Sequence, residues 1–204
     1  QAADETGIPI ILQAGPSCRA HTPVPILGKM FRYLAEQTKT HICCHIDHGY
    51  TIRECIEGID SGFTSVMFDG SKLSLKENIK ITSSIVKKAH NSKVSVEGEV
   101  GFVGYANGKN SKGTLIDEAI KFSRESNVDA MAISVGNTHL QTKKIAKIDF
   151  DKIKEIQNSI STPLVLHGGS GIPNQTRKKL AKETNIAKFN IGTEVRMAFG
   201  NALK

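Results

Sequence analysis

The chain has 204 residues, of which 39% are hydrophobic and only 5% aromatic, and its net charge is +7. This length supports one domain with a sizeable core, and no apolar run reaches the roughly 20 residues that a membrane-spanning helix requires. The excess of lysine is typical of solvated helix faces, and no basic and aromatic cluster offers a platform on which nucleic-acid bases could stack. We therefore expect neither a membrane nor a nucleic acid among the partners of this protein.

The cysteines show neither the spacing of a metal site nor that of a redox site; they are Cys18, Cys43, Cys44 and Cys55. Neighbouring Cys43 and Cys44 would point to opposite faces of a strand. We interpret all four as reduced packing residues, which predicts a cytoplasmic protein.

Apolar runs typical of strands alternate along the whole chain with amphipathic segments typical of helices. After a helix over residues 2–6, strands are expected at 9–14, 41–47, 64–69, 93–100, 130–136, 163–167 and 187–191. The helices that follow them are expected at 23–38, 51–60, 74–90, 116–127, 150–160, 174–184 and 194–204. Such alternation implies parallel strands joined by right-handed crossovers.

The seven strands leave two α/β architectures to compare. A doubly wound sheet that binds a dinucleotide would need a G-x-G-x-x-G turn after its first strand, and the chain has none there. The chain also begins inside a helix with no strand before it, and eight-stranded barrels typically have about 250 residues. We therefore predict a (β/α)8 TIM barrel, with residues 1–204 as its single domain and with its first strand and C-terminal part missing from this chain.

Three histidines follow strand-like runs, in the stretches H-I-C-C-H-I-D-H-G, M-A-I-S-V-G-N-T-H and P-L-V-L-H-G-G-S-G. They are His48, His139 and His167. Barrel enzymes carry their chemistry at the C-terminal ends of parallel strands, so three imidazoles there can bind one metal and leave a coordination position for substrate. The other histidines lack this shared placement and are expected to be ordinary polar or core residues.

Acidic residues accompany these histidines. Asp47 precedes His48, where a carboxylate serves either as a general base or as an acceptor that orients a ligand imidazole. Glu97 and Glu99 alternate with small or apolar residues and point to one face of their strand, and Asp69 ends the preceding strand. Acids inside a barrel are costly unless they are paired with cations or a metal, which indicates that they belong to the site.

A glycine-rich turn follows the third histidine directly, beginning with Gly168, Gly169 and Ser170. Its backbone N–H groups and the serine hydroxyl can hold a phosphate. The next strand end adds Gly192 and Thr193 ahead of a helix. Because barrels commonly bind phosphate between the loops after their last two strands, the pattern predicts a phosphate site here.

Six motifs, taken in order, resemble one known family. They read H-I-D-H-G (45–49), F-D-G-S (68–71), V-E-G-E-V-G (96–101), G-N-T-H (136–139), L-H-G-G-S-G-I-P (166–173) and F-N-I-G-T-E (189–194). Together they resemble the class II, zinc-dependent ketose-bisphosphate aldolases, the group that holds fructose-bisphosphate and tagatose-bisphosphate aldolases. The resemblance covers nearly the whole chain.

The resemblance implies a role for each motif. The ligands of a Zn²⁺ ion would be His48, His139 and His167. Asp47 would be the catalytic acid and base. Asp69 and Glu99 would either hold the metal in a displaced position or organise the site. Asn190 would contact the dihydroxyacetone part of a phosphorylated sugar, whose phosphate would be held by Gly168, Ser170, Gly192 and Thr193. An enzyme of carbohydrate metabolism that forms a homo-oligomer, a dimer or a tetramer, is expected.

The sequence departs from the family at two points. Relatives often have glycine after the second zinc histidine, where a backbone group meets phosphate and sometimes a monovalent cation, Na⁺ or K⁺, but this chain has Leu140. Many relatives also carry acids in the loop that is 101–113 here, where this chain has none and Tyr105 is either a substitute proton donor or a packing residue. This loop has four glycines and almost no apolar anchor, so we expect it to be mobile until it closes over substrate.

The function predicted is the metal-dependent, reversible aldol cleavage of a ketose 1,6-bisphosphate, of fructose or tagatose, to dihydroxyacetone phosphate and glyceraldehyde 3-phosphate, as in glycolysis. Two alternatives stay open. A metal-dependent hydrolase of the same fold would use metal-bound water and would not need the glycine-rich turn. A non-catalytic sugar-phosphate-binding protein would not need Asp47.

Overall fold

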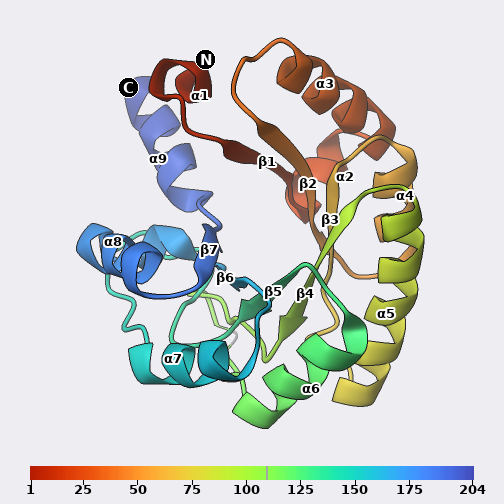
Figure 1. The fold of residues 1–204 in the computed structure, drawn as a ribbon. Coiled ribbons are helices and arrows are strands. Elements are labelled where there is room, and N and C mark those ends of the chain that lie inside the picture. The colour runs from red at the N-terminus through yellow and green to blue at the C-terminus, as the bar shows by residue number, and fades with distance from the viewer. Residues whose placement is uncertain (109) are drawn as a thin grey trace. The chain divides into compact units, whose positions relative to one another are not determined.

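The computed structural model of the chain describes residues 1–108 and 110–204, so Lys109 of the predicted 101–113 loop lies outside the described residues. Contacts divide the chain into two compact units. The first unit holds Gln1–Gly70 and Lys76–Gly98, and the second holds Ser71–Leu75 and Glu99–Lys204. Figure 1 shows each unit as strands with helices packed along them.

In the first unit, helices alternate with the first strands of the chain. The strands are β1 (Ile10–Ala14), β2 (Ile42–Gly49), β3 (Ser65–Phe68) and most of β4 (Ser95–Val100). The helices are α1 (Ala2–Thr6), α2 (Pro16–His21), α3 (Val24–Glu36), α4 (Ile52–Asp60) and nearly all of α5 (Leu75–Asn91). Helix α4 lies close on the sheet because Gly58 faces Ile46 and Val66, where a Cβ would collide with both side chains.

The second unit continues the same alternation. Its strands are the end of β4, β5 (Ala130–Ile133), β6 (Leu164–Leu166) and β7 (Ile186–Phe189). Its helices are α6 (Ile116–Ser126), α7 (Phe150–Ser159), the 3₁₀ turn η1 (Gly169–Gly171), α8 (Asn174–Glu183) and α9 (Thr193–Ala202). Met131, Ile153 and Leu164 are fully buried and belong to the core of this unit, whereas α9 buries none of its residues.

The strands follow one another in the order β1 to β7, and every described pairing is parallel. Among the residues that the structure describes, no pairing joins β7 to β1, so these two strands are the edges of an open sheet. The prediction of a closed (β/α)8 barrel is therefore wrong. Periodicity detects a strand from its own residues, but the closure of a sheet depends on pairing between distant edges, which periodicity does not report.

The predicted strands and helices are present, and the largest shift of an end is in β5, predicted to reach 136 and found to end at Ile133. Helix α4 begins where Thr51 forms a capping box with Glu54. The sequence did not reveal α2, which has six residues, or η1, which has three, because neither is long enough to show amphipathic periodicity.

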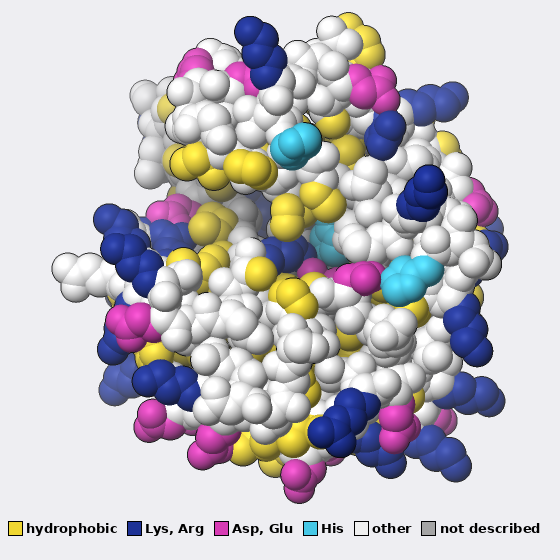
Figure 2. All heavy atoms as spheres, viewed as in Figure 1, with side chains coloured by type: hydrophobic (Ala, Val, Ile, Leu, Met, Phe, Trp, Pro, Cys, Tyr) yellow, Lys and Arg dark blue, Asp and Glu magenta, His cyan; other side chains and the backbone are white. Residues whose placement is uncertain are grey.

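The surface and the thiols bear on the expectations drawn from composition. None of the helices in residues 1–108 and 110–204 combines the length and apolar character needed to cross a membrane. On the face seen in Figure 2, lysine and arginine side chains are dispersed among acidic and neutral ones rather than gathered in one patch. All four cysteines are free thiols, and Cys44 and Cys55 are buried.

Candidate active site

Asp47 and His48 lie at the C-terminal end of β2, where the strand leaves its regular pairing. The register against β3 shifts between Ile46 and Gly49. The backbone of His48 has a φ of +86°, a left-handed conformation that residues other than glycine seldom adopt. Irregularities of this kind re-aim side chains beside active sites, and here the two affected residues are the predicted acid and the first predicted ligand.

The imidazole of His48 is oriented by Asp69, which follows β3. His48 Nδ1 lies 2.9 Å from Asp69 Oδ2, and the two side chains are only 7% and 6% exposed. A carboxylate on Nδ1 fixes the ring and directs Nε2 away from that contact, an arrangement common among histidines that bind metals. His48 Nε2 lies 3.9 Å from Asp47 Oδ1, so the predicted ligand and the predicted acid are neighbours.

The carboxylate of Asp47 lies beside Gln13 and Gly15. Gln13 Nε2, on β1, donates a hydrogen bond to Asp47 Oδ1 at 3.1 Å. A Cβ at position 15 would lie 3.4 Å from Asp47 Oδ2, in ordinary van der Waals contact with that oxygen. The Asp47 side chain is 19% exposed, which puts it within reach of a small molecule from solvent.

A buried polar network lies next to these residues in the same unit. His45 Nδ1 contacts Ser65 Oγ at 2.8 Å, and His45 Nε2 lies 3.8 Å from Glu97 Oε2. All three side chains are buried, so these contacts explain how Glu97 is tolerated inside the unit. This agrees with the prediction that His45 is a core residue.

In the second unit, the other two predicted ligands lie together. The ring centroids of His139 and His167 are 5.4 Å apart, with the rings at 72° to each other. His167 Nδ1 lies 3.9 Å from Glu99 Oε2, and both side chains are buried. Asn137 Nδ2 donates to the backbone carbonyl of His167 at 3.1 Å, which ties the segment after β5 to the end of β6.

The 101–113 loop is anchored to this pair of histidines. Val103 is 1% exposed, and its amide donates to Glu99 Oε1 at 3.2 Å, so the expectation of a loop with almost no apolar anchor is wrong. The amide of His139 donates to the carbonyl of Gly104 at 2.8 Å. The ring of Tyr105 stacks on the ring of His139, with centroids 4.9 Å apart, which supports its interpretation as a packing residue.

The glycine-rich turn after β6 is joined to the end of β7. Gly168 has a φ of +65°, and a Cβ there would collide with the carbonyl oxygen of Thr138, so the position requires glycine. The amide of Gly169 donates to the carbonyl of Asn190 at 2.9 Å, and the amide of Asn190 donates to the carbonyl of Leu166 at 3.0 Å. These bonds fix the two segments that were predicted to hold phosphate side by side.

Ser170 and the start of α9 complete that region. The amide of Glu194 donates to Ser170 Oγ at 3.0 Å, so the serine hydroxyl hydrogen stays available for another acceptor. Gly192 and Thr193 stand at the beginning of α9, where backbone amides and the helix dipole favour an anion.

An ion cluster surrounds the Glu194 carboxylate. Arg177 Nη1 lies 2.9 Å from one carboxylate oxygen and Lys144 Nζ lies 2.7 Å from the other. The hydrogen bond from Arg177, followed by the one from Lys144, holds the pKa of Glu194 below its usual value of 4.5. The cluster ties the segment after β5 and helix α8 to the first turn of α9.

Leu140 occupies a backbone conformation that favours glycine. Its φ is +61°, and its side chain is 45% exposed. The next residue, Gln141, packs over Gly171, where any Cβ would collide with the glutamine side chain. The departure from the family therefore changes the side chain at this position but keeps the glycine-like backbone.

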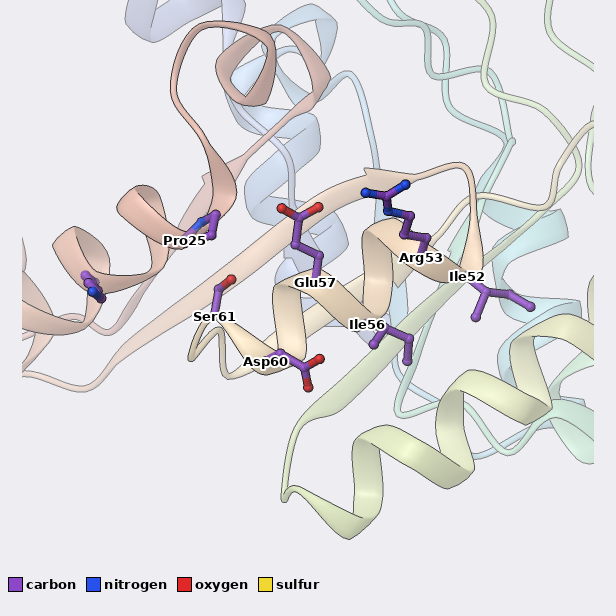
Figure 3. Close-up of a pocket in the computed structure, with 8 residues that line it drawn as sticks. Pro25, Ile52, Arg53, Ile56, Glu57, Asp60 and Ser61 are labelled. Carbon is purple, nitrogen blue, oxygen red and sulfur yellow. The ribbon is translucent and has the colours of Figure 1, made fainter.

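A surface pocket in the first unit is lined by other residues. Figure 3 shows this cavity of about 870 Å³ between α3 and α4, with Pro25, Ile52 and Ile56 on its apolar side and Glu57 and Asp60 at its edge. None of the residues that line it was predicted to belong to the site.

The sequence pointed to Gln13 only as a candidate for distinguishing the sugar, and it indicated no role for Arg19 or Asn137. The motif G-N-T-H contains Asn137, so that residue could have been found from its place between β5 and a predicted ligand. Gln13 and Arg19 contact residues 28 to 34 positions away, and no local spacing predicts such contacts.

Comparisons with known proteins agree with this arrangement. A family model described as class II fructose-bisphosphate aldolase matches residues 1–204. The chain is 41% identical over 166 residues to a 6-phospho-5-dehydro-2-deoxy-D-gluconate aldolase of Shouchella clausii, covering 80% of this chain and 56% of the relative. It is 42% identical over 170 residues to a fructose-bisphosphate aldolase of Ureaplasma parvum, covering 81% of this chain and 58% of the relative.

A solved structure is similar as well. The crystal structure of the YdjI aldolase from Escherichia coli K12 matches with a TM-score of 0.87 and 30% identity, over 99% of this chain and 72% of that one. The chain thus spans little more than half the length of the two curated relatives above. With the family model matched from end to end, the chain belongs to the class II fructose-bisphosphate aldolase family.

Proposed function

We propose that this protein catalyses the metal-dependent, reversible aldol cleavage of a ketose 1,6-bisphosphate to dihydroxyacetone phosphate and glyceraldehyde 3-phosphate. The match of the class II aldolase family model to residues 1–204 is the observation that carries the proposal. The relatives are named for substrates that differ in their phosphate groups, a fructose bisphosphate and a 6-phospho sugar acid. Fructose and tagatose bisphosphates are therefore the first substrates to test, and a 6-phosphorylated sugar acid is the third.

We propose His48, His139 and His167 as ligands of a divalent metal, with zinc as the first candidate. Two observations support this donor set. Asp69 engages Nδ1 of His48 and so leaves Nε2 as its ligand atom, and the imidazoles of the other two histidines are neighbours within their unit. Imidazole nitrogens suit zinc. When bound, the metal polarises the ketose carbonyl as a Lewis acid.

Asp69 and Glu99 are proposed to organise these ligands. Asp69 hydrogen-bonds to His48, and Glu99 lies 3.9 Å from Nδ1 of His167. Carboxylates in such positions orient the imidazole and raise its basicity as a ligand.

Asp47 is proposed to move the proton. In cleavage, its carboxylate accepts the proton of the hydroxyl on the carbon that becomes the aldehyde, the C–C bond breaks, and the electron pair of that bond moves towards the ketose carbonyl. In condensation, Asp47 returns the proton to the aldehyde oxygen. Gln13 donates a hydrogen bond to Oδ1 of this carboxylate and so helps to hold it in position.

The phosphate of the dihydroxyacetone half is proposed to bind the hydroxyl of Ser170 and the amides of Gly192 and Thr193. The amide of Gly169 already donates to the carbonyl of Asn190, so it is not proposed as a donor to the phosphate. Gly168 and Gly169 instead leave space for the phosphate to approach the backbone closely. The side chain of Asn190 is proposed to contact the dihydroxyacetone hydroxyl. Binding at the phosphate then orients the bond that reacts.

The cellular location and the oligomeric state are proposed from the cysteines and from the exposed apolar residues. Four free cysteines support a reducing, cytoplasmic location. A homo-oligomer, a dimer or a tetramer, is proposed because α9 exposes Val195 and Phe199 to 61% and 68%. A monovalent cation is left out of the proposal, since Leu140 removes the close backbone approach that glycine would allow.

A coupled assay for dihydroxyacetone phosphate tests the proposal. Full-length protein is incubated with each of the three substrates, with and without chelator, and inorganic phosphate release is measured in parallel. We expect dihydroxyacetone phosphate from a bisphosphate, and no product in chelator. Phosphate release without C–C cleavage would instead indicate a hydrolase, and binding without turnover would indicate a sugar-phosphate-binding protein.

A further inference from the structure

Arg19, on the short helix α2, reaches the backbone that carries Asp47 and His48. Its Nη1 donates to the carbonyl oxygens of Ala14 and Asp47, each at 2.6 Å, and its Nη2 donates to the carbonyl oxygen of His48 at 3.0 Å. The Arg19 side chain is only 7% exposed. One guanidinium therefore binds the C-terminal ends of β1 and β2 together.

The backbone of Asp47 and His48, to which Arg19 binds, is irregular, and its carbonyl groups need hydrogen-bond donors. The register of β2 against β3 shifts between Ile46 and Gly49, so the two carbonyls of the residues between them depart from the regular ladder. Buried carbonyl groups of folded proteins are almost always hydrogen-bonded, and Arg19 supplies the donors here. The φ of +86° at His48 belongs to a class of strained conformations that persist only where surrounding contacts fix them.

The guanidinium is itself oriented from the opposite side. Glu54 Oε1 lies 3.8 Å from Arg19 Nη2. The other oxygen of Glu54 accepts the amides of Tyr50 and Thr51, directly after β2. Glu54, which belongs to the capping box of α4, therefore supplies the negative charge opposite Arg19. It also binds the backbone that directly follows β2.

From these contacts we propose that Arg19 is a positioning residue, which fixes the backbone of Asp47 and His48 so that the proton-transferring oxygen and the ligand nitrogen hold their places. The inference rests on the proposed function. Arg19 does not contact the reacting atoms, so its effect passes through the two carbonyls it binds. Lysine cannot replace it, because an ammonium group lacks the planar fork that serves three acceptors at fixed angles.

The test compares Arg19→Met and Arg19→Lys with wild type and with Arg32→Met. Arg32 is a matched control in the same unit, since its side chain is 47% exposed and forms a 3.1 Å ion pair with Glu36 on α3. Four quantities are measured on full-length protein: kcat and KM for the ketose bisphosphate with zinc loaded, the Kd for Zn²⁺ by chelator competition, and the temperature of thermal unfolding.

We expect Arg19→Met to lower kcat by about 10²-fold, the effect of a misplacement of roughly 1 Å, while KM changes by less than about threefold. The Kd for Zn²⁺ should rise by about 10-fold or more, as for other groups that orient a ligand. Arg19→Lys should lose at least about tenfold in kcat, and Arg32→Met should match wild type. A residue that only stabilised the fold would lower the unfolding temperature without changing the kcat or Kd of the folded protein.

The possible results distinguish failure of the positioning role of Arg19 from failure of the proposed function. If folded Arg19→Met keeps the kcat and zinc affinity of wild type, the positioning role is overturned. If Arg19→Met does not fold, Arg19→Lys decides, and wild-type kinetics in that variant, or failure of both to fold, overturns the role as well. If wild type cleaves no ketose phosphate, the proposed function fails on its own, and the comparison of Kd for Zn²⁺ still tests Arg19, with equal values as the contrary result.

Discussion

Asp47 differs from the other acids of the first unit because one carboxylate oxygen is held by Gln13 and the other lies beside Gly15. Asp47→Asn keeps the shape of the side chain but removes its ability to accept a proton as a carboxylate. We expect kcat to fall by at least about 10²-fold, the low end for loss of a general acid–base group. Steady-state kinetics at saturating zinc measure this.

The alternative role of Asp47 gives a different result. If Asp47 only oriented His48, the substitution would weaken zinc affinity by about 10–100-fold, and excess zinc would restore turnover. Gln13→Glu is a useful companion, because it leaves Asp47 in place but removes its hydrogen-bond donor. Recovery of Asp47→Asn to wild-type turnover in excess zinc would contradict the catalytic assignment.

Leu140 provides a test of backbone strain at a single residue. Its φ of +61° costs a residue with a Cβ about 1–2 kcal/mol, whereas glycine adopts it freely. We expect Leu140→Gly to be more stable than Leu140→Ala by about 1 kcal/mol, since both lose the side chain but only alanine keeps the Cβ. Chemical denaturation measures the difference, and an alanine variant as stable as the glycine variant would contradict it.

Cys55 should be unreactive in the folded protein. Burial, with a smaller contribution from the Glu54 charge, raises its pKa to about 12. At pH 8 its thiolate fraction is then about 10⁻⁴, because each unit between pH and pKa lowers it tenfold, and thiolate is the form that alkylates. Mass spectrometry after brief iodoacetamide treatment should find Cys18 modified before Cys55, and equal rates would argue against this burial.

Single-residue roles were only partly predictable from the sequence. The burial of Glu97 and Glu99 and the positions of His48 and His167 at the ends of β2 and β6 follow from local alternation, which the sequence contains. His139, in contrast, lies well beyond the end of β5 at Ile133. The contacts of Gln13 and Arg19 depend on how strands pair and on a register shift, which local patterns do not encode.

At the level of elements, the N-terminal end of α4 is determined by a local sequence signal, a capping box. Thr51 Oγ1 accepts the amide of Glu54 at 3.2 Å, and Glu54 accepts the amide of Thr51 at 2.9 Å. Thr51→Ala removes the cap and should cost about 1 kcal/mol, which lowers the unfolding temperature by roughly 2–4 °C. Thr51→Ser keeps the hydroxyl and should match wild type; a serine variant as unstable as the alanine variant would contradict the capping role.

The attachment of α9 to α8 should depend on pH through Glu194. Its pKa is lowered in the folded protein, so its stabilisation is fully present above about 4.5 and is lost as the pH falls through the lowered value. Because its side chain is 37% exposed, we expect Glu194→Gln to cost less than about 1 kcal/mol at pH 7. The difference from wild type should shrink in denaturation at lower pH.

The matched control is Glu183→Gln on α8, which removes a more exposed pair with Lys179 at 4.0 Å. It should change stability at pH 7 by less than Glu194→Gln does. A Glu194→Gln variant whose deficit grew as the pH fell would contradict the role of the ion cluster.

At the level of the whole molecule, the sequence predicted the alternation of strands and helices and their parallel pairing, but not the open sheet. Each predicted strand carries its own signal of apolar residues between turn residues. Closure requires the first and last strands to pair, and no residue of β1 or β7 specifies that by itself. The expectation of a closed barrel came from strand count and fold analogy, and the edges at β1 and β7 overturn it.

The central claim is that this chain performs aldol cleavage with a divalent metal bound by histidines. The most direct measurement is a zinc titration of chelator-treated, full-length protein, with bound zinc and cleavage of the preferred ketose bisphosphate measured on the same samples. We expect no cleavage without metal, a rise in activity in proportion to bound zinc, and a plateau at one zinc per chain, whereas His48→Ala should show neither the rise nor the plateau. Full cleavage by protein that retains no divalent metal would contradict it.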